Sequence, residues 1–277
     1  LDTGETEMSQ TDFKQKYPQI WKRFTPAETL VRYIWYGGIV FIAVWSVSNL
    51  DIPWFYFLDA HVQAADLITR MLPPYWPFFL DIIQPLVETL HIATLGTVFT
   101  IFLAFPVAIL SARNTTFNKT TWFIGRFILV TSRSVNTVVW GLLFVAIFGP
   151  GPVAGIFSVA ARSIGFVGKL SAEAIEEIDV GAVEAIEATG ASKLQILLIG
   201  VLPQVMPIIL GTIIYRWDIN IRESTVLGFV GAGGIGIVLY SSINLFAWHE
   251  VSVILVSIFG VVILSEYLSI KARARIT

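Results

Sequence analysis

Four charged residues interrupt an apolar stretch in the second half of the chain: Arg216, Asp218, Arg222 and Glu223. On a helix, Asp218 and Arg222 would be neighbours, so this pair either neutralises itself and locks helices together or meets a bound anion. Arg216, Asn220 and Glu223 would share a different face. A guanidinium forms two parallel hydrogen bonds with phosphate-like oxyanions, so the surplus of arginine favours a role in anion binding.

Other familiar kinds of site find no support in the sequence. The chain has no cysteine, and its three histidines lack metal-ligand spacing, so we predict no metal site. No catalytic triad is suggested, and no P-loop motif for binding ATP is present. Residues 231–236 fit the pattern G-x-G-x-x-G, but a dinucleotide site requires a βαβ unit around it. We interpret these glycines as sites of close helix packing or of a backbone bend.

The composition indicates where these charges lie. Of 277 residues, 55% are hydrophobic and only 14% are charged, and the mean hydropathy is +0.74. Soluble domains carry roughly 25% charged residues. The deficit excludes a soluble enzyme, a disordered protein and a coiled coil, and it predicts an all-α integral membrane protein. The net charge of −2 gives no reason to expect a nucleic acid partner.

Six apolar segments are candidate membrane spans, for which a helix needs about 20 residues. We expect spans at residues 33–50, 85–112, 121–148, 153–168, 197 into the 220s, and 246–270. The basic segment before the first span is long for a signal peptide, so this span is interpreted as a retained anchor. Because residue 1 is leucine, Met8 is a candidate native start.

Lysine and arginine gather before the first span, after the second and fourth spans, and after the sixth. The positive-inside rule therefore places both termini in the cytoplasm. Aromatic residues and prolines after the first span suit the opposite bilayer interface. The expected organisation is a cytoplasmic N-terminal segment (1–32), a first transmembrane helix (33–50), an extracytoplasmic segment (51–84), a transmembrane core (85–270) and a basic cytoplasmic tail (271–277).

The segment between the fourth and fifth spans is acidic, on the side where loops are normally basic. Asp179 predicts the N-cap of a short helix, and Gly190 supplies the left-handed residue that ends it. Residues 192–195 form a capping box for the next helix, which would enter the membrane near Leu202. We expect a helix–turn–helix at the cytoplasmic face, suited to transmitting force from a soluble partner. The acids are Glu173, Glu176, Glu177, Asp179, Glu184 and Glu187.

Three short motifs here resemble the coupling (EAA) loop of permease subunits of type I ABC importers. They are Glu184-Ala185-Ile186, Gly190-Ala191-Ser192 and Leu202-Pro203-Gln204. Gly200 stands where that family has a branched residue. Residues 168–179, 215–222 and 225–236 are similar to phosphonate permeases, and the resemblance extends from about residue 85 to the C-terminus. Asn136 replaces a proline of these permeases, so the sequence offers no basis for a kink in the third span.

The resemblance implies a type I ABC importer permease fold with a cytoplasmic coupling helix within residues 171–203. It implies a homodimer in the bacterial inner membrane, two ATPase subunits that bind ATP and magnesium, and a periplasmic or surface-attached substrate-binding protein. The cargo implied is phosphonate or a related reduced-phosphorus oxyanion such as phosphite. The residues implied to contact the ATPase are Glu184, Ala185, Gly190, Ala191, Ser192, Leu202 and Pro203. The candidate anion path comprises Arg162, Arg216, Asn220 and Arg222, beside a group of charges formed by Asp218, Arg222 and Glu223.

Three alternatives remain at this point. A permease of the same type could carry another solute, such as methionine or an organic cation. A membrane enzyme acting on lipid or polyprenyl phosphates would need a catalytic cluster at one interface, and none is evident. A secondary transporter that does not use ATP would not need the acidic coupling segment.

Overall fold

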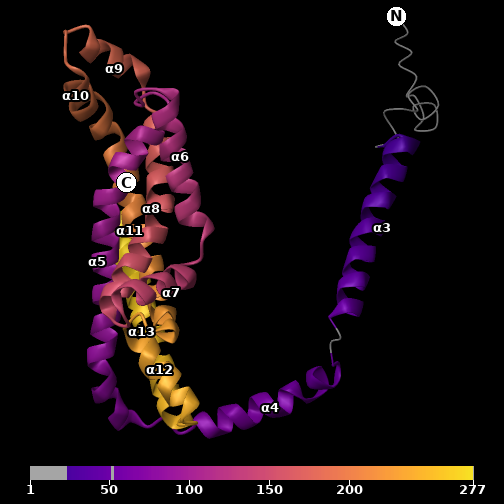
Figure 1. Ribbon diagram of the computed structural model, residues 1–277. Coiled ribbons are helices and arrows are strands. Elements are labelled where there is room, and N and C mark those ends of the chain that lie inside the picture. The colour runs from indigo at the N-terminus through magenta and orange to yellow at the C-terminus, as the bar shows by residue number, and fades with distance from the viewer. Residues whose placement is uncertain (1–23, 51–52, 277) are drawn as a thin grey trace, which may run out of the picture. The chain divides into compact units, whose positions relative to one another are not determined.

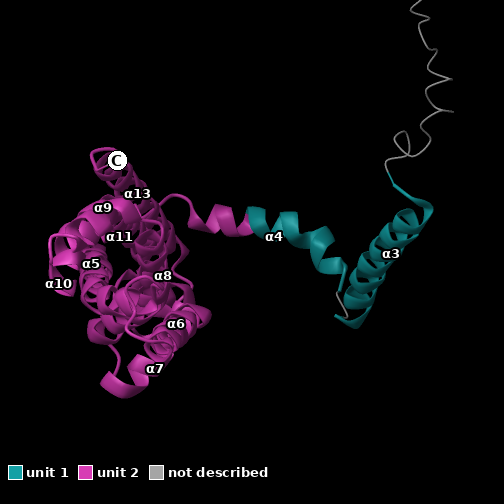
Figure 2. Cartoon of the chain, turned by 90° about the horizontal axis from the view of Figure 1, so that it is seen from above, with its two compact units in different colours: residues 1–65 teal, residues 66–277 magenta. Residues whose placement is uncertain are grey.

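The computed structural model describes residues 24–50 and 53–276, and every regular element within those ranges is a helix. The chain divides into two units, residues 1–65 and 66–277, which Figure 2 shows in different colours. Most of the expected N-terminal cytoplasmic segment, residues 1–23, lies outside the described residues.

The first apolar span is confirmed as helix α3 (Pro26–Asn49), which starts before the expected residue 33. Its start is set by a capping box, in which the Thr25 backbone N–H donates to the Glu28 carboxylate at 2.9 Å. Helix α4 (Phe55–Met71) follows within the segment expected to be extracytoplasmic, and it runs across the boundary of the two units. One side of α4 is polar, with a bond between Gln63 and Asp59 and an ion pair between Arg70 and Asp66.

The second unit is a bundle built around three helices, α5 (Phe79–Ser111), α8 (Pro152–Glu176) and α11 (Leu202–Leu227), which run side by side in Figure 1. Small residues allow the close approach. A Cβ atom on Gly96 of α5 would lie 2.6 Å from Val159 of α8, and one on Gly155 would lie 2.4 Å from the carbonyl oxygen of Ala232. Such small-residue packing is typical of helices that associate in membranes. Helix α13 (Trp248–Arg273) packs against α11.

Five helices of the described chain are long and apolar enough to cross a membrane, and the number rises to six if a bent pair is counted as one span. That pair is α6 (Lys119–Ser134) and α7 (Thr137–Phe148), which meet at 96°. The break needs no proline. Asn136 ends the first helix by capping the second, since its side chain accepts a hydrogen bond from the Val138 N–H at 3.0 Å.

Two further boundaries differ from the expectation. Helix α8 continues to Glu176 rather than ending at 168, because Ala172 and Ile175 pack into a core with Val201 and Val205. Helix α5 begins at Phe79 rather than 85, so its first turn belongs to the segment expected to be extracytoplasmic. A short helix that was not expected, α12 (Ile235–Asn244), follows the glycine-rich segment.

Candidate functional site

Glu223 of α11 is at the middle of a partly buried charge cluster that we call the Glu223 centre. Its carboxylate pairs with the guanidiniums of Arg216 at 3.0 Å and of Arg162 at 3.4 Å, and it accepts a hydrogen bond from the Thr137 hydroxyl. The side chains of Arg216, Glu223 and Arg162 are 4%, 22% and 29% exposed. Two guanidiniums face one carboxylate, so the centre has a surplus positive charge in a helical core.

Asn220 supports this centre from a fully buried position. Arg216 Nε donates to the Ser163 hydroxyl at 2.9 Å, and that hydroxyl donates to Asn220 Oδ1 at 3.0 Å. Asn220 Nδ2 in turn donates to the hydroxyl of Thr97 at 2.8 Å. The Asn220 amide is therefore engaged between helices, and through Ser163 it helps to hold the Arg216 side chain in place.

Arg162 also donates hydrogen bonds to backbone carbonyls at the break between α6 and α7. Its Nη1 donates to the carbonyl oxygens of Val135 at 2.9 Å and Arg133 at 3.4 Å. The last carbonyls of a helix have no partner within it, and a break at membrane depth needs another donor for them. The sequence showed Arg162 as a charge in an apolar stretch, but not that it closes a broken span.

Asp218 and Arg222 form the ion pair that their spacing predicts. Asp218 is 5% exposed and also accepts a hydrogen bond from the Ser265 hydroxyl of α13 at 2.7 Å, whereas Arg222 is 46% exposed. The pair therefore links α11 to α13. Glu223, which the sequence grouped with this pair, belongs instead to the centre with Arg162 and Arg216.

The acidic segment folds as its local signals predict. Helix α9 (Val180–Glu187) is capped by Asp179, whose side chain accepts from the Gly181 N–H at 2.9 Å. Gly190 has φ +80°, and a capping box at residues 192–195 opens α10 (Lys193–Gln195). Figure 1 shows α9 and α10 together at one end of the second unit.

Helix α9 is fastened to the start of α11. Val183 and Ile186 are half-buried, and a Cβ atom on Gly200 would lie only 3.2 Å from Ile186. Gly200 belongs to a π-helical turn (Ile196–Val201) that precedes α11. Gln204 completes the link, because its side chain accepts from the Asp179 N–H at 3.0 Å and donates to the Gly200 carbonyl oxygen at 2.7 Å. Helix α9 and the start of α11 are therefore joined by both packing and hydrogen bonds.

The residues expected to contact an ATPase lie on or beside α9. The surface is open where a partner would need it: Glu184, Ala185, Gly190, Ser192 and Pro203 are exposed, and Ala191 and Leu202 are half-buried.

The glycine-rich segment packs helices, as interpreted from the sequence. A Cβ atom on Gly236 would lie 2.2 Å from the Thr225 carbonyl oxygen. The N–H of Gly234 donates to the Glu88 carboxylate at 2.9 Å, and the N–H of Ile235 donates to the Thr89 hydroxyl at 2.8 Å. Glu88, an acid within the second span that the sequence did not single out, thus caps α12 from α5.

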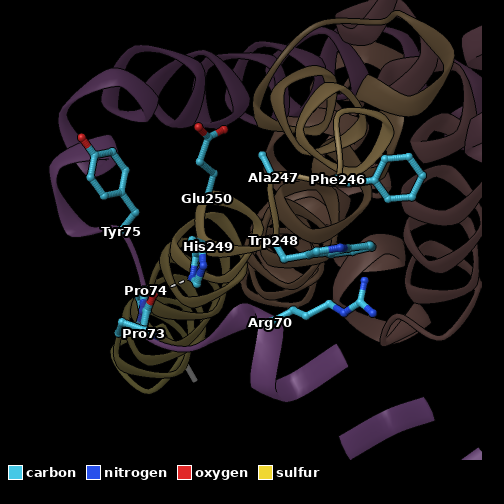
Figure 3. Close-up of a pocket in the computed structure, with 9 residues that line it drawn as sticks. All are labelled: Arg70, Pro73, Pro74, Tyr75, Phe246, Ala247, Trp248, His249 and Glu250. Atoms are coloured by element: carbon cyan, nitrogen blue, oxygen red, sulfur yellow. Dashed lines mark hydrogen bonds between the residues drawn. The ribbon is translucent and has the colours of Figure 1, made fainter. Parts of the chain in front are cut away.

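A hollow of about 650 Å³ lies at the end of the bundle where α5 begins, away from α9 (Figure 3). Figure 3 shows His249 turned toward the carbonyl oxygen of Pro73, and its Nδ1 lies 2.9 Å from that oxygen. The described residues contain no group of three His, Asp or Glu placed to hold a metal ion. The lining residues are Arg70, Pro73, Pro74, Tyr75, Phe246, Ala247, Trp248, His249 and Glu250.

These features define a class of protein. Residues 104–272 match the family of binding-protein-dependent transport system inner membrane components, and the chain belongs to this family. It is therefore a multi-pass permease subunit of a transport system, not a membrane enzyme or a transporter that works without a binding protein.

The chain is also similar to particular members of this family and to solved transporter structures. The chain is 39% identical over 232 residues to the phosphite transport system permease protein PtxC of Stutzerimonas stutzeri, with 84% of each chain covered. It is 37% identical over 214 residues to the phosphate-import permease protein PhnE of Mycolicibacterium smegmatis, covering 77% of this chain and 40% of that one. An inward-facing structure of the MetNI methionine ABC transporter matches with a TM-score of 0.64 at 21% identity, over 73% of this chain and 98% of that chain. The predicted type I ABC importer permease fold is thereby confirmed.

Proposed function

We propose that this permease imports phosphite, phosphonate or a related reduced-phosphorus oxyanion, powered by a separate ATPase. Similarity to a phosphite permease along 84% of both chains supports this cargo. The structural observation that carries the proposal is the Glu223 centre, where Arg162 and Arg216 share one carboxylate. Guanidinium groups suit phosphate-like oxyanions because two parallel N–H donors of the guanidinium match two oxygens of the anion.

Within this centre, Glu223 occupies the donors that an anion would use. A passing oxyanion would compete with the carboxylate for Arg162 and Arg216, which are the first candidates for contact. Asn220 positions Arg216 through Ser163. Arg222 contacts the anion only if it leaves Asp218, so it ranks behind the other two arginines.

The proposed assembly has two permease copies, two ATPase subunits that hold ATP and magnesium, and a substrate-binding protein. The exposed surface of α9 contacts the ATPase, and its link through Gln204 moves α11 and with it the Glu223 centre. The protein lies in the bacterial inner membrane with both termini cytoplasmic. The hollow of Figure 3 then faces the binding protein.

The test is uptake of radiolabelled phosphite into proteoliposomes that contain the permease, its ATPase and its binding protein. Uptake should require ATP and should be competed by methylphosphonate but not by methionine. Arg162→Lys and Arg216→Lys should each retain partial uptake, since a lysine attracts the anion without the forked contact. Arg275→Lys in the exposed tail is the matched control and should transport normally. Competition by methionine alone would refute the proposed cargo.

A further inference from the structure

A second hollow lies at the turn between α5 and α6, and we call it the Trp122 hollow. Its volume is about 670 Å³. Glu176, at the end of α8, accepts a hydrogen bond from the Arg113 backbone N–H at 2.9 Å, so the turn lies at the same end of the bundle as α9. Two spanning helices end here, which places the hollow at the level of a bilayer interface. The lining residues are Arg113, Thr116, Asn118, Lys119, Trp122 and Phe123.

The charges of this hollow are unbalanced. Arg113 and Lys119 are exposed and have no ion pair within the described ranges, while the neighbouring carboxylate of Glu176 is engaged by Arg126 at 3.0 Å. The guanidiniums of Arg113 and Arg126 lie 5.8 Å and 5.4 Å from the Trp122 ring centre. The Trp122 indole N–H is shielded from solvent and has no hydrogen-bond partner among the described residues. The hollow therefore offers the two exposed cations of Arg113 and Lys119 to an anion.

An apolar stripe leads away from the hollow along α6. Phe123, Phe127 and Val130 are exposed and fall at positions i, i+4 and i+7, so they share one helical face. Tryptophan is enriched at bilayer interfaces, and basic residues beside a membrane attract anionic lipids. A small free anion could use the cations but would leave the stripe unused.

We propose that the Trp122 hollow binds the phosphate headgroup of an anionic phospholipid, with one acyl chain lying along the stripe of Phe123, Phe127 and Val130. This site is separate from the Glu223 centre, and its occupation does not depend on which solute the permease carries. Bound lipid would brace the end of α5 against α6 beside Glu176, close to the start of the segment that carries α9.

Native mass spectrometry of the assembled transporter can test the site. The micelles would contain equal amounts of dioleoyl phosphatidylglycerol and dioleoyl phosphatidylethanolamine, which differ in headgroup charge but not in acyl chains. The wild type should retain the anionic lipid preferentially. The amount of phosphatidylglycerol retained by the double variant Arg113→Gln, Lys119→Gln should be lower than that retained by the wild type by about tenfold or more. The control Lys271→Gln, Arg275→Gln removes two charges from the tail and should keep this preference.

Three results would overturn the proposal. They are equal retention of the two lipids by the wild type, unchanged retention by the double variant, and displacement of the lipid by millimolar inorganic phosphate. The last result would assign the hollow to a free anion. If the double variant fails to assemble, Phe123→Asp tests the same site, because an acid at its edge should expel phosphatidylglycerol and leave phosphatidylethanolamine binding unchanged.

Discussion

The α9 segment is stabilised by residues close together in the sequence, whereas the Glu223 centre is formed by residues from different helices. Helix α9 depends on neighbours in sequence, since Asp179 caps it and Gly190 ends it, and its acids are exposed. The centre brings together Thr137, Arg162 and Glu223 from three different helices, with Thr137 buried and the two charged side chains partly buried. The α9 segment therefore presents an exposed surface to a partner while its other side is linked to α11 through Gln204, whereas the centre lies within the packed helices.

Helix α11 connects the two regions. Gln204 near its start holds α9, and Glu223 near its end holds the broken span through Thr137 and Arg162. The π-helical turn Ile196–Val201 lies directly before α11, and such turns often mark functional sites. Substitutions in α9 should therefore reduce coupling with little loss of stability, and substitutions in the centre should reduce stability first.

The largest effect is expected from Glu223→Leu. Removing the carboxylate leaves Arg216 buried without its counter-charge, which should lower the free energy of unfolding by about 3–5 kcal/mol. Glu173→Leu is the control, because the Lys169–Glu173 pair is exposed and should contribute less than about 1 kcal/mol. Thermal unfolding in detergent measures both variants. Equal destabilisation by the two would show that the Glu223 centre is no more important than a surface pair.

Gly190→Val should disrupt coupling. At φ +80°, a side chain that is branched at Cβ strains the turn by roughly 1–2 kcal/mol, enough to lower the population of the docking conformation about tenfold. Substrate-stimulated ATPase activity should fall accordingly, while the unfolding temperature should change little. Gly190→Asn is the matched variant, because asparagine tolerates left-handed backbone, and it should retain stimulation. Normal stimulation in Gly190→Val would remove this turn from the coupling path.

Glu184→Lys should have a smaller effect on the same surface. Reversing one exposed charge on α9 should weaken ATPase binding several-fold, and the loss should be greatest at low salt, where charges are least screened. The dissociation constant of the ATPase, measured at low and high salt, checks this. Asp59→Lys, in the segment expected on the other side of the membrane, should leave it unchanged. An ATPase affinity insensitive to Glu184 would place the contact elsewhere.

The sequence predicted the local features well. Six apolar segments, the cap at Asp179 and the capping box at residues 192–195 all depend on residues close together in the chain. The break in the third span also had a local signal, because Asn136 is a strong N-cap residue, although a proline was the feature sought there. Helix α8 runs past 168 because Ala172 and Ile175 pack into a core with residues far along the chain, and the ion pair of Glu176 with Arg126 of α6 lies at its end.

The non-local features could not be predicted in the same way. Arg216 and Glu223 were expected on one face of a helix, but nothing in the sequence paired Glu223 with Arg162, which lies on α8. The bond from Gly234 to Glu88 likewise depends on how α5 and α12 pack. Helical periodicity indicates which side chains share a face, and only the packing of helices decides which faces meet.

The smallest effect is expected when both members of the Asp218–Arg222 pair are replaced. Arg222→Met alone leaves the buried Asp218 carboxylate with only the Ser265 hydroxyl, and it should lower the free energy of unfolding by about 1–3 kcal/mol. Adding Asp218→Leu removes the uncompensated charge, so the double variant should return to within about 1 kcal/mol of the wild type. Because the pair links α11 to α13 and lies outside the Glu223 centre, the double variant should also keep its uptake of radiolabelled phosphite, whereas Arg216→Met should lose it. Loss of uptake by a stable double variant would instead place Arg222 on the anion path and reverse the ranking of the three arginines.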